Sequence, residues 1–246
     1  MSHFHTQAKL YAEHRPDYPA ELFEFIADSV HDHKLAWDCA TGNGQAAIGL
    51  ADNFERVVAT DISAEQIAQA KPHPRVEYLV APAEQSGLPD KSVDAVTITQ
   101  GLHWLDIPRF YDEVRRVSKA GGVFVATVYS DPVLEDPDAD RILQYYNKVV
   151  VGAYWPPERK LVDESYASIP FPFEELQTPH LTMERTWSIQ ELAGYLRSWS
   201  ATVRYTEQNG ADPVIQFESE MLAIWSDSKQ PQRLNWPFTI RAGRIS

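Results

Sequence analysis

The stretch Trp37-Asp38-Cys39-Ala40-Thr41-Gly42-Asn43-Gly44-Gln45 decides the fold of this chain. Its pattern indicates a buried strand that runs into a loop with two glycines, and residues 45–51 then favour a helix. A ligand can lie against a glycine loop, and backbone N–H groups at a helix N-terminus are free to donate to it. Seventeen positions after Gly44, Asp61 ends a second β-branched strand, where its carboxylate can accept hydrogen bonds from a ribose diol. Together these features indicate a nucleoside cofactor.

The alternation of strands and helices over residues 36–129 is typical of a doubly wound parallel sheet. We expect strands over 35–39, 56–60, 75–80, 93–99 and 122–129, and helices over 44–52, 63–70 and 107–119. Prolines punctuate the chain after Tyr129, and there we expect helices near 138–151, 158–166, 188–199 and 212–227. Strands near 180–187 and 234–242 complete the sheet as a hairpin interrupted by helices. The predicted fold class is therefore α/β, with a doubly wound, mostly parallel seven-stranded sheet and a partly helical cap.

Two cofactor classes compete for the glycine loop. Gly42-Asn43-Gly44-Gln45-Ala46-Ala47 fits the dinucleotide pattern G-x-G-x-x-G/A, which a nicotinamide-dependent enzyme would share. The string from Asp38 to Gly44, however, resembles the D-x-G-x-G-x-G loop of class I S-adenosylmethionine-dependent methyltransferases. Ala40 stands where that family usually has its first glycine, and we expect an ordinary backbone conformation there.

The resemblance continues in order along the chain. Residues 81–84 look like the family's third-strand segment near the adenine, and 92–104 look like its fourth strand and the loop that follows. Residues 115–125 resemble its helix, G-G turn and fifth strand. The resemblance implies a Rossmann-like methyltransferase fold with S-adenosyl-L-methionine as cofactor. We therefore expect a single domain over residues 1–246, which consists of an N-terminal arm and helix (1–34), a cofactor-binding core (35–130) and the remaining sheet with cap helices (131–246).

The N-terminal string from Tyr11 to Pro19 is similar to the Y-x-x-x-R-P-x-Y-P segment of the trans-aconitate methyltransferase-like branch. That resemblance implies that Arg15 contacts the cofactor carboxylate and that Tyr11 and Tyr18 close over the site. An arginine guanidinium suits this role because it can donate two parallel hydrogen bonds to one carboxylate. The alternative is a surface arm whose arginine pairs with Glu13 or Asp17. The cofactor-binding residues that we predict are Tyr11, Arg15, Asp38, Ala40, Gly42, Gly44, Asp61, Ile62, Ala83, Glu84 and Gln100.

His103 and Trp104 follow the fourth predicted strand and match an A-L-H-W-like string of the same branch. His103 is our candidate catalytic residue, because a histidine can accept a proton from a hydroxyl, thiol or amine nucleophile. A carboxylate nucleophile would need no base, and His103 would then only position it; a histidine bonded to backbone at a helix entry is the third possibility. Asp94, inside the strand, is expected either to be structural or to contact site residues without touching the ligand. The predicted substrate pocket contains Tyr18, His103, Trp104 and Trp155.

Composition limits the partners. A formal net charge of −13 repels phosphate backbones, which argues against nucleic acid. The sequence contains no run of about eighteen apolar residues, so we predict no membrane span. We see no secretory pattern at the N-terminus and therefore expect a cytoplasmic protein. The single cysteine, Cys39, is expected to be a buried strand residue, and the eight histidines show no metal-ligand spacing. No obligate protein partner is evident.

The sequence thus predicts a methyltransferase that acts on a small-molecule acceptor, with O-methylation of a carboxylic acid as the finer hypothesis. Two alternatives stay open at this point. One is an NAD(P)-dependent oxidoreductase that uses the same glycine loop, and the other is a cofactor-binding protein without transferase activity.

Overall fold

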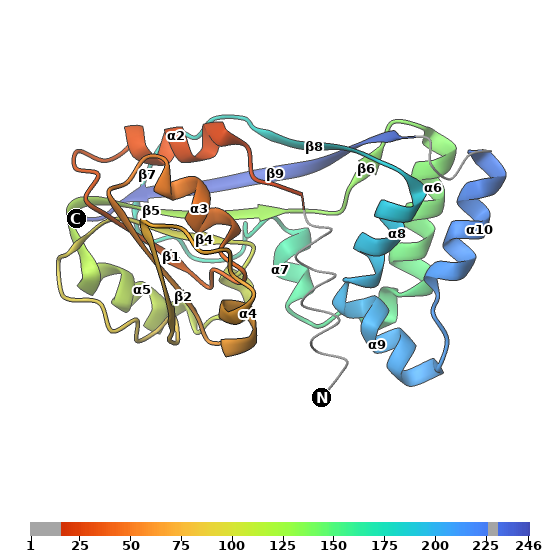
Figure 1. The fold of residues 1–246 in the computed structure, drawn as a ribbon, viewed down its shortest axis with the longest axis horizontal. Coiled ribbons are helices and arrows are strands. Elements are labelled where there is room, and N and C mark those ends of the chain that lie inside the picture. Colours follow the sequence, from red (N-terminus) through yellow and green to blue (C-terminus); the bar gives the residue numbers. More distant parts are fainter. Residues whose placement is uncertain (1–15, 226–230) are drawn as a thin grey trace. The chain divides into compact units, whose positions relative to one another are not determined.

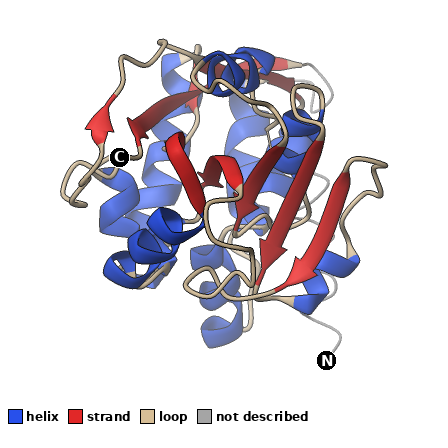
Figure 2. Ribbon diagram, turned by 90° about the vertical axis from the view of Figure 1, so that its left-hand side faces the viewer, coloured by secondary structure: helices blue, strands red, loops and turns tan. Residues whose placement is uncertain are grey.

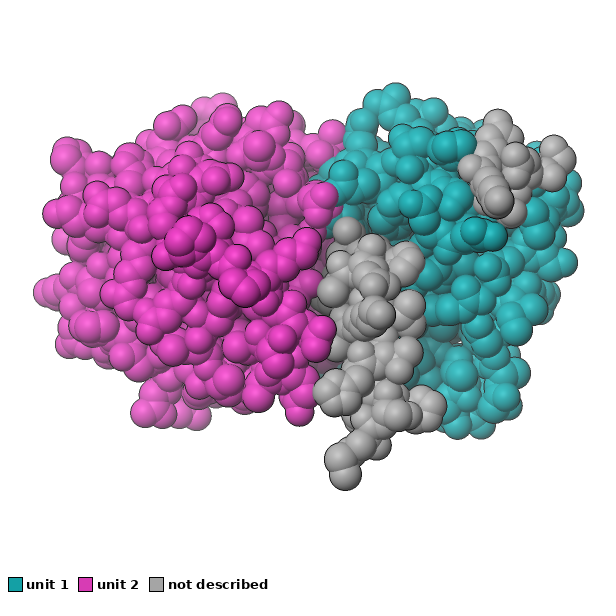
Figure 3. All heavy atoms as spheres, viewed as in Figure 1, with its two compact units in different colours: residues 1–16, 131–160, 183–237 teal, residues 17–130, 161–182, 238–246 magenta. Residues whose placement is uncertain are grey.

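A computed structural model describes residues 16–225 and 231–246 (Figure 1). The chain forms two compact units, coloured separately in Figure 3. The sheet unit contains Asp17–Ser130, Leu161–Thr182 and Phe238–Ser246, and the helical unit contains Pro16, Asp131–Lys160 and the described residues of Met183–Pro237. The predicted contacts of Tyr11 and Arg15 lie outside the described residues.

Parallel strands, drawn in red in Figure 2, form the centre of the sheet unit. They follow the spatial order β3-β2-β1-β4-β5. These strands are β1 (Leu35–Cys39), β2 (Arg56–Asp61), β3 (Val76–Val80), β4 (Val93–Thr99) and β5 (Ser118–Tyr129). The long strand β9 (Gln232–Arg244) pairs antiparallel with β5, and β7 (Glu174–Glu175) pairs with β9. The carboxyl ends of β1, β2 and β4 therefore share one edge, which is the ligand edge in open sheets of this type.

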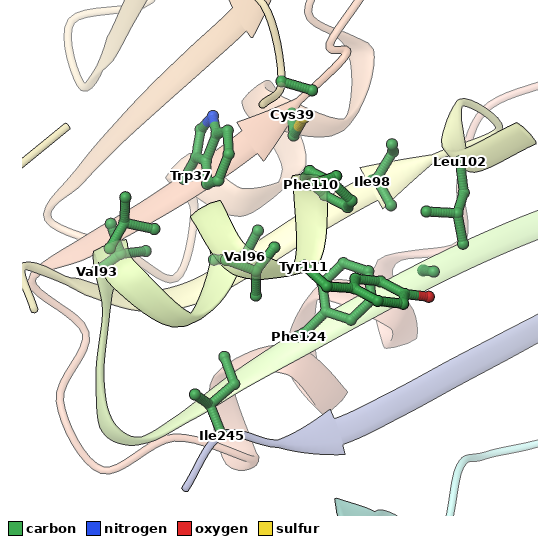
Figure 4. Close-up of a cluster of buried hydrophobic side chains, with 14 of the residues drawn as sticks. Trp37, Cys39, Val93, Val96, Ile98, Leu102, Phe110, Tyr111, Phe124 and Ile245 are labelled. Carbon is green, nitrogen blue, oxygen red and sulfur yellow. The ribbon is translucent and has the colours of Figure 1, made fainter. Parts of the chain in front are cut away.

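Side chains that alternate along the strands build a separate core on each face of the sheet. On one face Ala36, Val57 and Ala95 pack with α2 (Ala20–Asp28) and α3 (Gln45–Ala51). On the other face Trp37, Val96 and Phe124 pack with α5 (Ile107–Val117), as Figure 4 shows. Cys39 is fully buried in this second cluster, as expected. Helices on both faces are what a doubly wound sheet requires. The remaining helical segments of this unit are α4 (Ala64–Ala68) and η1 (Leu102–Trp104), and the boundary between the two units falls between Lys160 and Leu161, within α7 (Arg159–Asp163).

The helical unit is built from short helices whose aromatic side chains pack together. Its helices are α6 (Pro137–Tyr145), the turns η2 (Tyr146–Val150) and η3 (Gly152–Tyr154), α8 (Ile189–Arg197), α9 (Ser200–Asn209) and α10 (Val214–Ile224). Strands β6 (Val133–Leu134) and β8 (Thr182–Trp187) pair with β9. The Trp236 ring meets those of Trp187 and Tyr195 edge to face, and the Trp187 and Tyr195 rings are tilted against each other; the three centroid distances are 5.0–5.8 Å.

Most of the predicted elements are confirmed, and the differences are local. The described residues contain seven strands of five or more residues, and β6 and β7 add two strands of two residues each. The helix predicted over 158–166 is shorter, because Ser165 and Tyr166 adopt left-handed backbone conformations. The helix α9 was not predicted, and its β-branched residues have low helix propensity. It ends at Gly210, whose φ of 69° suits a glycine C-cap.

Asp94 is structural, as expected, and it joins the beginnings of three segments at the opposite edge of the sheet. One of its oxygens accepts the N–H groups of Lys34 (3.0 Å) and Leu35 (2.8 Å), and the other pairs with the ammonium of Lys119. The carboxyl side chain is only 3% exposed. Without it, two backbone donors at the start of β1 lose their partner.

We therefore expect Asp94→Ala to lower the free energy of unfolding by about 2–3 kcal/mol, since buried donors left without partners carry their full desolvation cost. Asp90→Ala is the matched control, because the Asp90 carboxylate pairs with Arg116 but is 75% exposed, and it should cost less than about 1 kcal/mol. Urea unfolding measures both variants. Equal losses would contradict the anchoring role.

Candidate active site

The loop between β1 and α3 holds three residues with positive φ. Ala40 has φ 50°, Gly42 has φ 58° and Gly44 has φ 84°. A Cβ on Gly44 would lie 2.4 Å from the Tyr78 hydroxyl oxygen, so this position requires glycine. The expectation of an ordinary backbone at Ala40 is wrong. The chain turns there in the left-handed region, which costs a residue with a Cβ about 1–2 kcal/mol.

Asp38, in β1, connects this loop to β4 through hydrogen bonds of its side chain. Its side chain is fully buried, and its two oxygens accept hydrogen bonds from the hydroxyl groups of Thr41 in the loop and Thr97 in β4. Burial raises the pKa of Asp38 from 3.8 to about 6, although the two hydroxyl donors counteract part of the rise. Any effect of Asp38 on a ligand therefore acts through the position of the loop.

Asp61 lies at the adjacent strand end and holds the loop from the side. One carboxylate oxygen accepts the N–H of Gly42 at 2.8 Å, and the other accepts the N–H of Ser63 at 2.8 Å. The neighbouring Ile62 side chain is 78% exposed, which is unusual for an isoleucine beside a strand end. The structure thus brings the glycine loop into direct contact with the Asp61 carboxylate, the two features from which the sequence analysis predicted a nucleoside cofactor.

The predicted residues after β3 and β4 lie in the same unit but are engaged with the protein. Ala83 is buried in the core, and one Glu84 oxygen accepts the N–H of Asp106 at 3.0 Å. Gln100 has φ 56°, and its amide bonds both the carbonyl (3.0 Å) and the N–H (2.8 Å) of Tyr129. The side chain of Gln100 therefore joins β4 to β5, so a cofactor contact from this residue would have to come from its backbone.

His103 lies in the short helix η1, just beyond the carboxyl end of β4. Its Nδ1 is 2.8 Å from the hydroxyl oxygen of Tyr166, a fully buried residue that the sequence analysis did not identify. Trp104 follows with its ring centroid 4.7 Å from the imidazole and with 57% of its surface exposed. No local pattern could have revealed Tyr166, because it lies 63 positions further along the chain.

The other two predicted pocket residues have aromatic or polar partners within their own units. In the sheet unit, the Tyr18 ring centroid is 6.5 Å from that of Tyr129. In the helical unit, Trp155 donates its Nε1–H to Asn147 at 2.8 Å, and the Arg159 guanidinium lies 4.1 Å from the Trp155 ring centroid. Whether Tyr18 and Trp155 contact a substrate stays a prediction.

Two features are absent from residues 16–225 and 231–246. No group of three or more His, Cys, Asp or Glu side chains in these ranges is arranged to hold a metal ion. No helix in these ranges has the length and apolar character needed to cross a membrane.

Comparison with known proteins then decides between the cofactor classes. The family model of the methyltransferase domain matches residues 37–126. A Dictyostelium discoideum protein assigned by name to the methyltransferases is 31% identical over 235 residues, which cover 94% of this chain and 89% of the relative. The chain belongs to the class I S-adenosylmethionine-dependent methyltransferases.

Two further matches agree with this membership. A solved structure from Anaeromyxobacter dehalogenans, described as a putative type II methyltransferase, is 43% identical to this chain and has a TM-score of 0.87. The match covers 94% of this chain and 98% of that structure. A Saccharomyces cerevisiae protein named a probable S-adenosylmethionine-dependent methyltransferase is 22% identical over 261 residues, covering 90% of each chain. The predicted methyltransferase fold, enzyme class and cofactor are confirmed, and the nicotinamide alternative is not supported. The trans-aconitate-like branch stays a prediction.

The described residues leave space beside Gly42 in the loop of this methyltransferase. Among the described residues, the atom nearest to a Cβ built on Gly42 is Gln66 Oε1, at 4.0 Å. A carboxylate acceptor, Asp61, and an exposed aliphatic side chain, Ile62, stand beside that open space. A ribose diol and the apolar face of a base need these two kinds of partner. The residues present therefore fit the nucleoside part of S-adenosyl-L-methionine.

If the cofactor lies against this loop, Gly42→Ala should weaken the binding of S-adenosylhomocysteine at least about tenfold, because the methyl group would occupy the ligand's space. Gly121→Ala is the matched control: Gly121 also has positive φ (78°) and open surroundings, but it lies at the beginning of β5. Both variants should lose about 1 kcal/mol of stability from backbone strain. Calorimetric titration that finds equal affinities for the two variants would contradict the loop contact.

The buried Asp38 predicts a pH dependence of stability. Its pKa is higher in the folded than in the unfolded chain, so its contribution to stability is fully present below about pH 4 and is lost as the pH rises through about 6. Asp38→Asn removes this titration. The unfolding free energy of the wild type, relative to that of Asp38→Asn, should therefore fall by about 2–3 kcal/mol between pH 4 and pH 7. Urea unfolding at several pH values measures the difference, and a constant difference would overturn the assignment.

Proposed function

We propose that this methyltransferase acts on a small-molecule acceptor, and that the acceptor is a carboxylic acid methylated on a carboxylate oxygen. The observation that carries the proposal is the geometry at the shared strand edge. Asp61 accepts the N–H of Gly42 there, where the two residues would form the nucleoside site, and His103 follows β4 with its Nδ1 within hydrogen-bond distance of the Tyr166 hydroxyl. The net charge of −13 supports a small acceptor over a nucleic acid.

The residues of this chain divide the work as follows. S-adenosyl-L-methionine, when bound, supplies an electrophilic methyl group on a sulfonium whose positive charge disappears during transfer. Asp61 would accept hydrogen bonds from the ribose hydroxyls, and the loop 40–44 would lie against the amino-acid part. Arg15, if it pairs as its motif implies, would contact the cofactor carboxylate. His103 and Trp104 would contact the acceptor. Most of the rate acceleration would come from aligning the acceptor with the methyl group of the cofactor.

A carboxylate acceptor is supported by two features. The N-terminal string and the His103-Trp104 pair are similar to segments of a branch that is named for methylating a tricarboxylic acid. A carboxylate is also ionised at neutral pH, so its reaction needs no base. Since the methyl group would then form an ester, the product has a chemical signature that distinguishes it from methyl ethers, amines and thioethers.

We predict that the enzyme releases S-adenosylhomocysteine when offered S-adenosyl-L-methionine and a panel of small carboxylic acids. With a methyl-labelled cofactor, mild alkali should convert the labelled product to volatile methanol, because esters hydrolyse under these conditions. Matched alcohols, amines and thiols serve as the control panel. Turnover only with the control panel, or a labelled product that resists alkali, would contradict the carboxylate proposal while leaving the methyltransferase assignment intact.

A further inference from the structure

The hydrogen bond between Tyr166 and His103 carries a further inference. The two atoms are 2.8 Å apart, and the Tyr166 ring is fully buried in the core cluster beneath the site. The imidazole itself is half-buried in η1. A buried hydroxyl therefore contacts one ring nitrogen, Nδ1, of the candidate catalytic histidine.

The backbone around Tyr166 is strained and held in place. Ser165 and Tyr166 have φ values of 52° and 60°, a consecutive pair of left-handed residues that costs about 1–2 kcal/mol each. The guanidinium of Arg241 donates to the carbonyl oxygens of Tyr166 and Ile169, both at 2.7 Å. The same guanidinium lies 4.5 Å from the Phe171 ring centroid. Such strain persists where the surrounding structure fixes it, and here the result is a tyrosine hydroxyl aimed at His103.

The direction of the hydrogen bond follows from the acidities of the two groups. A phenol, with a pKa of about 10, is a much stronger acid than the N–H of a neutral imidazole. An imidazole nitrogen, whose conjugate acid has a pKa of about 6.5, is in turn a better acceptor than a phenol oxygen. The favoured arrangement is therefore Tyr166 O–H donating to Nδ1. A neutral imidazole carries one N–H, so its proton then lies on Nε2.

We propose that Tyr166 is a positioning residue that fixes His103 in the Nε2–H tautomer, so that His103 donates a hydrogen bond to the acceptor and does not remove a proton from it. The tautomer follows from the Tyr166–His103 contact and the acidities of the two groups, and its consequence for catalysis rests on the proposed function. With no lone pair on Nε2, His103 suits an oxygen nucleophile that is already anionic.

The reaction balances without a base. The carboxylate oxygen of the acceptor forms a bond to the methyl carbon, and the carbon–sulfur bond breaks with its electron pair left on sulfur. The sulfonium charge and the carboxylate charge both disappear, and no proton moves. The Nε2–H of His103 would hold the second carboxylate oxygen and so direct the first one toward the methyl group.

The tautomer can be measured directly. Long-range ¹H–¹⁵N spectra of the imidazole rings at pH 8 distinguish protonated from unprotonated ring nitrogens, and the signals lost in His103→Gln assign the residue. We expect wild-type His103 to carry its proton on Nε2. A wild-type spectrum with the proton on Nδ1 would overturn the proposal, and this measurement requires neither an acceptor nor a variant of Tyr166.

A pair of variants tests the role of the hydroxyl. Tyr166→Phe should mix the two tautomers, whereas Tyr111→Phe should leave the His103 signals unchanged. Tyr111 is the matched control, because it lies in the same buried cluster and its hydroxyl has no hydrogen-bond partner among the described residues. If Tyr166→Phe leaves the His103 spectrum as in the wild type, the hydroxyl does not fix the tautomer.

With an acceptor in hand, kinetics separate positioning from folding. Tyr166→Phe should lower kcat about tenfold, the size of one hydrogen bond, with affinity for S-adenosylhomocysteine within about twofold. The loss should disappear when the substitution is made in His103→Gln, since Tyr166 acts only through His103. An equal loss in both backgrounds would show a structural role and contradict the proposal. If the wild type methylates no acid of the panel, the proposed function fails, but the tautomer is still decided by the spectra.

Discussion

The site depends on the carboxylate of Asp61 and the two backbone N–H groups that it accepts. Gly42 belongs to the loop after β1 and Ser63 to the segment after β2, so a single side chain joins the ends of two neighbouring strands. The strands themselves are in register, with Cys39 opposite Thr60. A carboxylate has more acceptor positions than these two N–H groups use, so it can bind ribose hydroxyls and still hold the loop.

Asp38 and Asp94 show how the rest of the sheet keeps that loop in place. Asp38 holds the loop from beneath through Thr41 and Thr97, and Asp94 fixes the start of β1 at the far edge. Both carboxyl groups are buried, and both use their oxygens on donors within the protein. Both residues therefore contribute to function by positioning the backbone: Asp94 fixes where β1 begins, and Asp38 fixes the loop that follows β1.

The sequence predicted what local chemistry determines. Alternating apolar residues and two glycines were enough to place β1, its loop and the helix after it, and the carboxylate at the end of β2 followed from the same pattern. The conformation of Ala40 was predicted wrongly, because tertiary packing decides it. A Cβ on Gly101, beyond the end of β4, would lie 3.1 Å from the Ala40 Cβ, so the two strand ends are packed closely against each other. The Tyr166–His103 contact joins residues far apart in the chain, and no spacing in the sequence indicates it.

The central claim is that Asp61 holds both the loop and the cofactor, and calorimetric titration of Asp61→Ala with S-adenosylhomocysteine tests it most directly. Asp52→Ala, an exposed carboxylate at the end of α3, is the control. We predict that Asp61→Ala loses about 1.5–3 kcal/mol of binding free energy, or roughly ten- to a hundredfold in affinity, while Asp52→Ala binds as the wild type does. Wild-type affinity in a folded Asp61→Ala variant would contradict the claim.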